Sequence, residues 1–386
     1  MSGLFFKEMS ITQQRYKPSP CVAVETSEHD MHDSPEDLTT WARLEDILSI
    51  CQREIKGAHV NADSKADHCQ RQHKNLTIIA AVAGTVAVIV AILQLTELRY
   101  GFVPMPILEG ASVLIAVGAV VAGVWSKRQP GWFLARHQAE RCRFLKFRFL
   151  IDPALWIGTH PQRAERIAKL PVEVHEIRQL GLPGLRTWAE AGMVPQAPAL
   201  GAACPAPPYE LRELIDYYLR KRLCNQMSWF NTRAQQLSQR DRILKRLPPW
   251  LFFGSVFAAL LHFTYDAFVN LGRAPAQVSV LGASIGVSIA LVLVAVILPV
   301  LGGGFRTLRS AYQFARNTSR YTAALEGLTP SYDALKAELQ NLEATGGGVA
   351  QTGASAIFYH MWRSEQILEA EHREWLRLMM QAGWYG

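Results

Sequence analysis

The chain contains four stretches of apolar residues separated by polar segments, and each is long enough to cross a bilayer as a helix. In the last of them, Ala274 to Phe305, no Asp, Glu, Lys, Arg or His occurs. A helix rises about 1.5 Å per residue and a bilayer core is roughly 30 Å thick, so about 20 apolar residues suffice to cross it. The pattern predicts transmembrane helices over residues ~76–96, ~107–125, ~249–271 and ~278–301.

Basic residues are concentrated on one side of these predicted helices. Residues 126–148 contain seven Lys or Arg and one Glu, whereas the loop at 97–106 contains one Glu and one Arg. Lys and Arg favour the cytoplasmic side of a membrane. We therefore predict an all-α, multi-pass protein of the cell inner (plasma) membrane, with four transmembrane helices in two tandem hairpins and both termini in the cytoplasm. The basic residues expected at the membrane surface are Lys127, Arg128, Arg136, Arg141, Arg143, Arg242, Lys245, Arg246, Arg306 and Arg309.

Amphipathic stretches surround the hairpins and predict long cytoplasmic helices. Residues 209–247 contain neither Pro nor Gly, and Pro248-Pro249 is expected to end or kink that helix at the membrane. Both halves follow one plan, with a polar helix, two spans and a basic exit, which indicates a parallel repeat. The predicted organisation is a mobile N-terminal arm (1–40), a two-span unit (41–150), a Pro-rich connector with short helices (151–208) and a second two-span unit with C-terminal helices (209–386).

The composition of the chain limits which binding partners and which kinds of catalytic or metal site we expect. The net charge is +7, with 49% hydrophobic and 19% charged residues, and the Lys and Arg residues cluster beside the apolar stretches. The anionic inner leaflet is therefore the expected partner, and nucleic acid is not. The six cysteines form no CxxC pair, so reduced thiols are expected. Nucleophile elbow, Walker and dinucleotide motifs are absent from the sequence, which predicts neither catalysis, nor a cofactor, nor a metal site.

Three ionisable residues lie within or at the edges of the predicted spans: Glu109, His262 and Asp266. Such groups are costly in lipid and usually face protein or water. His262 and Asp266 are four residues apart and share one helix face. Repeated around an oligomer, they could line a water-filled path; alternatively, they reach the outer head groups. Ser284 and Ser288 form a second, weakly polar face that could meet water.

Small residues give the fourth span a smooth ridge, formed by Ser279, Gly282, Gly286 and Ala290. Small side chains let helix backbones approach closely and pack in a membrane. The ridge is compatible with packing inside one chain and with contact between copies of the chain.

Two segments resemble the SLATT family of two-transmembrane effector domains. The helix before the third span resembles the family pattern xRLxxQxxWYxxKA, with Arg222, Gln226 and Trp229 in three of its positions and Phe230 and Arg233 in place of Tyr and Lys. The C-terminal helix resembles the acidic-and-Trp closing helix of the same branch, through Glu365, Glu371 and Trp375. After the first hairpin, Trp132, Arg136, Ala139, Glu140 and Arg143 resemble a segment of a second branch.

The resemblance implies two tandem copies of this domain, over roughly residues 40–150 and 209–380. It further implies a homo-oligomeric, pore-forming effector of a bacterial conflict or antiviral defence system, which conducts ions and depolarises the membrane. The trigger would be a nucleotide second messenger or a signal-sensing partner protein. The alternative is a non-conducting membrane scaffold that recruits a cytosolic partner through its helices.

Overall fold

The computed structural model describes residues 30–95, 105–125, 128–191, 208–271, 277–280, 283–344 and 351–381, and most of them are helical. The first half contains α2 (Pro35–Thr40), η1 (Ala42–Leu44), α3 (Glu45–Leu95), α4 (Met105–Trp125), α5 (Arg128–Leu150), α6 (Pro153–Trp156), α7 (His160–Gln179) and α8 (Leu182–Glu190). The second half contains α9 (Pro208–Tyr217), the π-helical η2 (Tyr218–Cys224), α10 (Asn225–Asn270), β1 (Gln277–Val280), β2 (Ala283–Gly286), α11 (Val287–Tyr312), α12 (Phe314–Ala344) and α13 (Gln351–Gln381).

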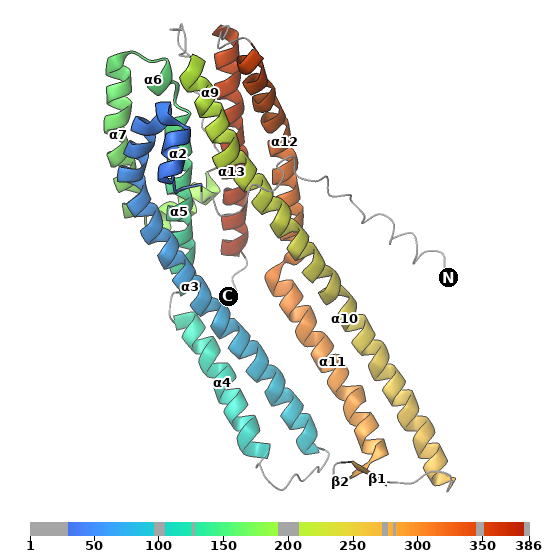
Figure 1. Cartoon of the computed structure of the whole chain (residues 1–386). Coiled ribbons are helices and arrows are strands. Elements are labelled where there is room, and N and C mark those ends of the chain that lie inside the picture. The colour runs from blue at the N-terminus through green and yellow to red at the C-terminus, as the bar shows by residue number, and fades with distance from the viewer. Residues whose placement is uncertain are drawn as a thin grey trace.

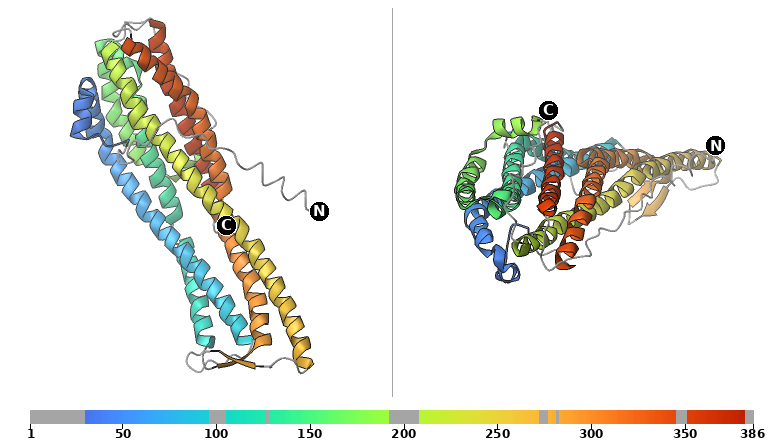
Figure 2. Two further views of the ribbon diagram at one scale, coloured as in Figure 1. Left: turned by 45° about the vertical axis from the view of Figure 1, so that its right-hand side comes forward. Right: turned by 90° about the horizontal axis from the view of Figure 1, so that it is seen from above.

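The molecule is elongated and has two different ends (Figures 1 and 2). At one end, most of the helices gather into a bundle, which we call the packed bundle. At the other end, α4 packs along the second half of α3, and α11 packs along the second half of α10. We call these two pairs the apolar hairpins. Because α3 and α10 are each continuous, they connect the packed bundle directly to the hairpins.

Three helices are long and apolar enough to cross a membrane by length and composition: Ala42–Ile92, Tyr209–Asn270 and Val287–Ala344. The remaining apolar stretch forms a shorter helix, Ile107–Gly123, within α4. The prediction of helices long and apolar enough to cross a membrane is confirmed for three of the four, and the four-span arrangement stays a prediction.

The fourth predicted span differs from the expected helix at its beginning. Residues 277–280 and 283–286 form an antiparallel hairpin in which Val280 pairs with Ala283, and helix α11 starts only at Val287. Its strands contain β-branched residues that alternate with serine, a pattern that favours an extended backbone. The continuous helix predicted over ~278–301 is therefore wrong for residues 278–280 and 283–286.

Prolines interrupt fewer helices than the sequence suggested. Helix α10 continues through Pro248 and Pro249 to Asn270, and α12 continues through Pro330. A Cβ atom added at Gly302 would lie 3.7 Å from the Pro248 backbone, so α11 packs closely against the proline site. The two prolines lack backbone N–H donors, so two helical hydrogen bonds are missing where α11 approaches α10.

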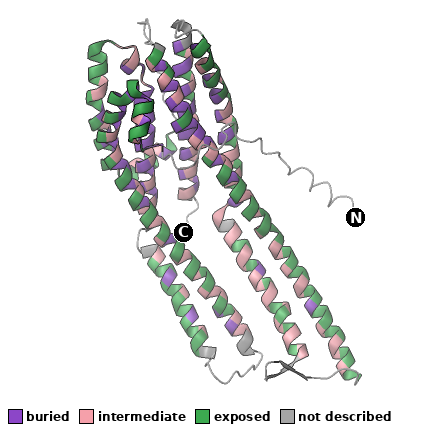
Figure 3. Ribbon diagram, in the orientation of Figure 1, coloured by how far each residue is buried: buried purple, intermediate pink, exposed green. Residues whose placement is uncertain are grey.

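Burial separates the two ends of the molecule (Figure 3). One large hydrophobic core fills the packed bundle and combines residues of both halves, among them Leu48, Phe147, Leu214 and Ile357. Large apolar side chains of the hairpins are instead exposed, and Phe263 reaches 76% exposure. Such a surface is the kind that a bilayer would cover.

The cysteines follow the expectation only in part. Cys51, Cys69 and Cys142 are free thiols, as predicted. Cys224 is disulfide-bonded, so the prediction of reduced thiols is wrong for that residue.

Candidate functional site

The centre of the packed bundle contains four buried cations. Lys146 and Arg143 come from α5 in the first half of the chain, and Lys221 and Arg222 come from η2 in the second half. Arg222 and Lys221 are each 1% exposed. Removing a cation from water costs several kcal/mol unless partner carboxylates compensate it, as they do here.

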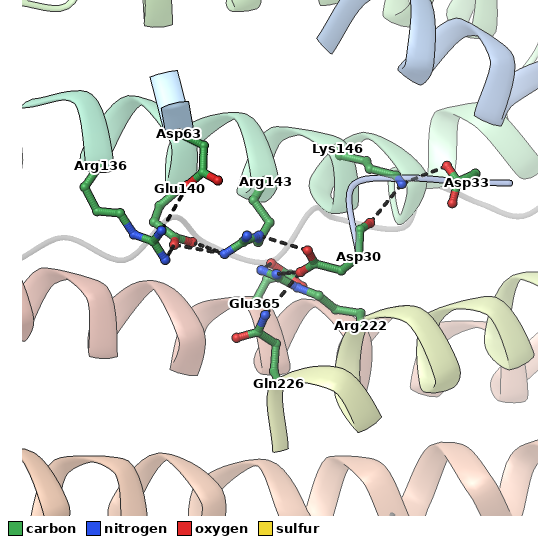
Figure 4. Close-up of polar contacts among 10 residues, drawn as sticks. All are labelled: Asp30, Asp33, Asp63, Arg136, Glu140, Arg143, Lys146, Arg222, Gln226 and Glu365. Carbon is green, nitrogen blue, oxygen red and sulfur yellow. Dashed lines mark hydrogen bonds and ion pairs between the residues drawn. The ribbon is translucent and has the colours of Figure 1, made fainter. Parts of the chain in front are cut away.

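Arg222 is held on three sides (Figure 4). Its Nε and Nη2 atoms donate to the two carboxylate oxygens of Glu365, each at 2.8 Å, and its Nη1 lies 3.2 Å from Asp30. Asp30 also lies 3.1 Å from Nε of Arg143 and accepts a hydrogen bond from Gln226. Asp30 thus joins α5 of the first half to η2 of the second half.

Glu140 extends this network along α5. It accepts two hydrogen bonds from Nη1 of Arg143, both at 2.9 Å, and forms an ion pair with Arg136 at 2.6 Å. Arg136 also reaches Asp63 on α3, at 3.1 Å. The network therefore connects α3, α5, η2 and α13.

An acidic segment, residues 30–40, supplies half of the partners, and we call it the acidic strap. Asp33 lies 2.8 Å from Nζ of Lys146 and accepts a hydrogen bond from the Tyr217 hydroxyl at 2.8 Å. Asp37 lies 2.7 Å from Nζ of Lys221. The strap thus bridges the two halves at Asp30 and again at Asp33, and the prediction of a mobile arm is wrong for residues 30–40; residues 1–29 lie outside the described residues.

The π-helix η2 positions Lys221 and Arg222, which are adjacent in sequence yet both buried. A π-helical turn is wider than an α-helical turn, and such turns often mark functional positions. The sequence offered one signal for this arrangement, because Lys221 and Arg222 lie between the apolar positions Leu219 and Leu223.

Ion pairing outweighs desolvation within the network. Burial by itself would raise the pKa of Asp30, but Arg143 and Arg222 hold it below the ordinary value for an aspartate. Burial likewise opposes ionisation of Glu140, but Arg143 and Arg136 lower its pKa. Both carboxylates are therefore charged at neutral pH.

A second buried group lies where α5, α8 and α13 meet. The imidazole rings of His137 and His372 stack with an interplanar angle of 4°, and Nδ1 of His137 lies 3.2 Å from Nε2 of His372. Desolvation lowers the pKa of His137 to about 2 and that of His372 to about 3, so both rings are neutral at neutral pH. Trp188 and Trp375 pack against this pair.

Next to this pair, Glu371 lies 2.9 Å from Arg320. Burial raises the pKa of the Glu371 carboxyl to about 7 despite that ion pair. The desolvation cost is therefore larger than the compensation by Arg320 at this position.

Three of the residues predicted to line a pore come together in the second apolar hairpin. The Ser288 hydroxyl on α11 lies 2.9 Å from Nδ1 of His262 on α10, and Nε2 of His262 lies 3.6 Å from Asp266. The Asp266 side chain is 48% exposed. Glu109 belongs to α4 of the other hairpin, so the structure does not bring it to this polar chain.

The other predicted site residues are distributed differently from the expectation. Arg143 is 8% exposed inside the bundle, so its assignment to the membrane surface is wrong, and Arg136 pairs with Asp63 and Glu140. Arg141 lies over the Trp188 ring at 5.8 Å. Arg309 pairs with Asp241 at 2.8 Å, while the exposed basic residues are Arg242, Lys245, Arg246 and Arg306.

The small-residue ridge does not form as predicted. Ser279, Ser284 and Gly286 belong to the strands, so helical spacing does not apply to them; Ala290 lies on α11. Gly282 and Lys127 lie outside the described residues, and nothing is described of the Arg128 side chain.

Most residues that carry the SLATT resemblance lie in the bundle. Glu140, Arg222 and Gln226 belong to the charge network, Trp375 packs against Phe133 with ring centroids 6.1 Å apart, and Trp229 contacts Tyr321 at 5.1 Å. No protein-family model, no curated protein and no solved structure matches the chain. The family assignment therefore remains a prediction from these residues.

Proposed function

We propose that this protein is a membrane-embedded effector whose copies assemble into an ion-conducting pore and depolarise the membrane. In this proposal both apolar hairpins cross the bilayer, including the shorter helix α4, and the packed bundle lies in the cytoplasm. The observation that carries it is the polar chain Ser288–His262–Asp266 in the apolar parts of α10 and α11. Polar groups at membrane depth usually face protein or a water-filled path.

The hairpins leave ample surface for assembly. The most apolar windows of the three long helices are only 17%, 6% and 6% buried within the chain. Copies packed side by side could cover part of this surface, with lipid covering the rest. A ring of copies would then place the Asp266 carboxylates around a common axis.

The packed bundle supplies a route for a signal. The acidic strap connects the two halves through Asp30 and Asp33, and α3 and α10 run from the bundle into the hairpins. A ligand or partner that alters the strap contacts would change how the hairpins sit relative to each other. The SLATT resemblance suggests a nucleotide signal or a sensing partner protein for this role.

Conductance of the purified protein in planar bilayers tests the proposal. Wild-type protein should conduct, and Asp266→Asn should shift the reversal potential away from cations because a ring of negative charge is lost. Asp333→Asn, at an exposed position on α12, is the matched control and should leave conductance unchanged. Absence of conductance in every assembly state would contradict the proposal.

A non-conducting scaffold is the second candidate, and the extent of the packed bundle favours it. Long helices such as α12 and α13 present many exposed polar residues to a cytosolic partner. A scaffold would retain partner binding in the Asp266→Asn variant and would show no channel activity with or without that carboxylate.

A further inference from the structure

Three cations lie near the level where the two hairpins enter the packed bundle. Lys74 is on α3, and Arg233 and Arg240 are on α10. Arg233 donates to Gln236 at 3.3 Å and lies over the Trp229 ring at 6.0 Å, but it pairs with no carboxylate among the described residues. Lys74 and Arg240 are exposed, and neither forms an ion pair within the described part of the chain.

The neighbours of these cations place them where both hairpins enter the packed bundle. His73 stacks with Trp132, near the start of α5, with ring centroids 6.2 Å apart. Asp241 accepts a hydrogen bond from Arg309, near the end of α11, at 2.8 Å. Lys74 and Arg240 each adjoin one of these contacts in sequence, so they lie at the exits of the first and second hairpins.

The hairpins touch each other about three helical turns farther from the packed bundle. A Cβ atom added at Gly304 of α11 would lie 3.9 Å from the Thr85 hydroxyl of α3. Lys74 precedes Thr85 by eleven residues, which corresponds to about 16 Å along a helix. The cations are therefore on the bundle side of the point where the two hairpins meet.

Their positive charges are close enough to repel one another. Burial lowers the pKa of Lys74, and Arg233 and Arg240 lower it further. Asp67 opposes this effect, but Asp67 also lies 4.0 Å from Arg71 and so is shared with another cation. An anion placed between these side chains would relieve the repulsion.

Apolar side chains continue below the cations on the same helix face. Ile78 and Val82 follow Lys74 by four and eight residues, and they are 49% and 58% exposed. Residues four apart on a helix are neighbours on one face. A lipid whose head group binds at Lys74 could therefore place an acyl chain along this apolar strip. A free ion would gain nothing from the strip.

We propose that Lys74, Arg233 and Arg240 bind the phosphate of an anionic membrane lipid whose acyl chains lie along α3 between the hairpins. Basic sites between membrane helices on the cytoplasmic side commonly hold such head groups. The bound lipid would bridge α3 and α10 at the point where the bundle meets the membrane. The proposal requires the hairpins to cross a membrane, but it does not require that the protein conducts ions.

Native mass spectrometry of protein in nanodiscs with varied phosphatidylglycerol and phosphatidylcholine measures the binding directly. Wild-type protein should retain phosphatidylglycerol preferentially after release. Lys74→Gln/Arg240→Gln should weaken that retention about tenfold, because two charged contacts to the phosphate are lost. Lys74→Arg/Arg240→Lys, which conserves both charges, should retain the lipid and so reports that the fold is intact.

Lys65→Gln/Lys336→Gln is the matched control, since it removes two exposed charges from the packed bundle, away from the basic residues expected at the membrane surface. This control should retain phosphatidylglycerol like the wild type. Equal retention in the control and in Lys74→Gln/Arg240→Gln would overturn the proposal. Displacement of the lipid by inorganic phosphate alone would also overturn it, because the site would then bind a free anion.

Discussion

The packed bundle buries charged side chains, whereas the apolar hairpins expose apolar ones. In the bundle, Arg222, Lys221 and Lys146 are almost fully buried, and carboxylates of the strap and of α13 compensate them. In the hairpins, apolar side chains such as Phe263 are exposed, and the few polar groups contact one another. The comparison indicates that water surrounds the bundle and that another medium surrounds the hairpins.

The two regions are also stabilised by different interactions. The bundle joins distant parts of the chain through ion pairs whose partners differ by more than 100 positions, such as Arg222 and Glu365. The hairpins join neighbouring helices through packing and through single hydrogen bonds, such as that from Ser255 to the Ala295 carbonyl. A substitution should therefore cost much more at the network than in the hairpins.

The largest expected effect is at Arg222. Arg222→Met leaves Glu365 and Asp30 without their shared buried cation, and we expect the free energy of unfolding to fall by about 3–5 kcal/mol. Arg212→Met is the control, because the Arg212–Glu343 pair is 51% exposed at both partners; it should cost about 0–1 kcal/mol. Chemical denaturation in detergent, followed by tryptophan fluorescence, measures both. Equal losses of stability would show that the buried ion pairs contribute no more than an exposed pair.

Acidification should destabilise the bundle next most strongly, through His137 and His372. Their folded pKa values, about 2 and about 3, lie below the ordinary 6.5, so only the unfolded chain takes up these protons as pH falls through 6.5. Stability from these groups is therefore lost progressively between about pH 6.5 and pH 3. From pH 7 to pH 5.5 this loss should be roughly 2.5 kcal/mol.

The control for this effect is His137→Phe/His372→Phe, measured over the same pH range. Glu371 acts in the opposite direction, because its folded pKa of about 7 lies above the ordinary 4.5, and the folded state gains protons on acidification. Glu371 is present in both proteins, so the difference between their pH profiles isolates the two histidines. Identical profiles would mean that the imidazoles are solvated in the folded protein.

The smallest expected effect is in the second hairpin. Ser255 donates a hydrogen bond to the Ala295 carbonyl, and Ser255→Ala removes it. Hydrogen bonds between membrane helices contribute about 0.6 kcal/mol on average, so the unfolding midpoint in detergent should barely move. Gly254→Leu serves as the comparison at the adjacent position, where an added Cβ would lie 3.1 Å from Leu298. A loss for Ser255→Ala as large as that for Arg222→Met would remove the distinction between the two regions.

The sequence predicted the apolar helices well because hydropathy is a local property. Residues 250–270 continue as helix because their apolar side chains can all face lipid or a neighbouring helix. Local pattern failed at the start of α11, where alternating serine and β-branched residues favoured strands over the expected helix. The helix does not end at Pro248 and Pro249, one of the two outcomes that the local pattern allowed there.

The charge network was beyond prediction from one sequence. The strap was expected to be a mobile arm, because ETSEHDMHDSPEDL has few apolar residues. Its aspartates become buried because Arg143, Lys146, Lys221 and Arg222 converge on them from two separate helices. Arg143 was expected at lipid head groups for the same reason: a basic residue beside a span has no visible partner in the sequence.

The amino-acid sequence alone determined where the chain is apolar and that most of those stretches form helices. These features depend on composition within a window of about 20 residues, and neighbours in sequence are sufficient to define them. Only the tertiary structure decided that Asp30, Arg143, Arg222 and Glu365 share one buried site. Whether a charge is solvated by water or by a partner depends on which distant segments meet, and that pairing is set by the packing of the whole bundle.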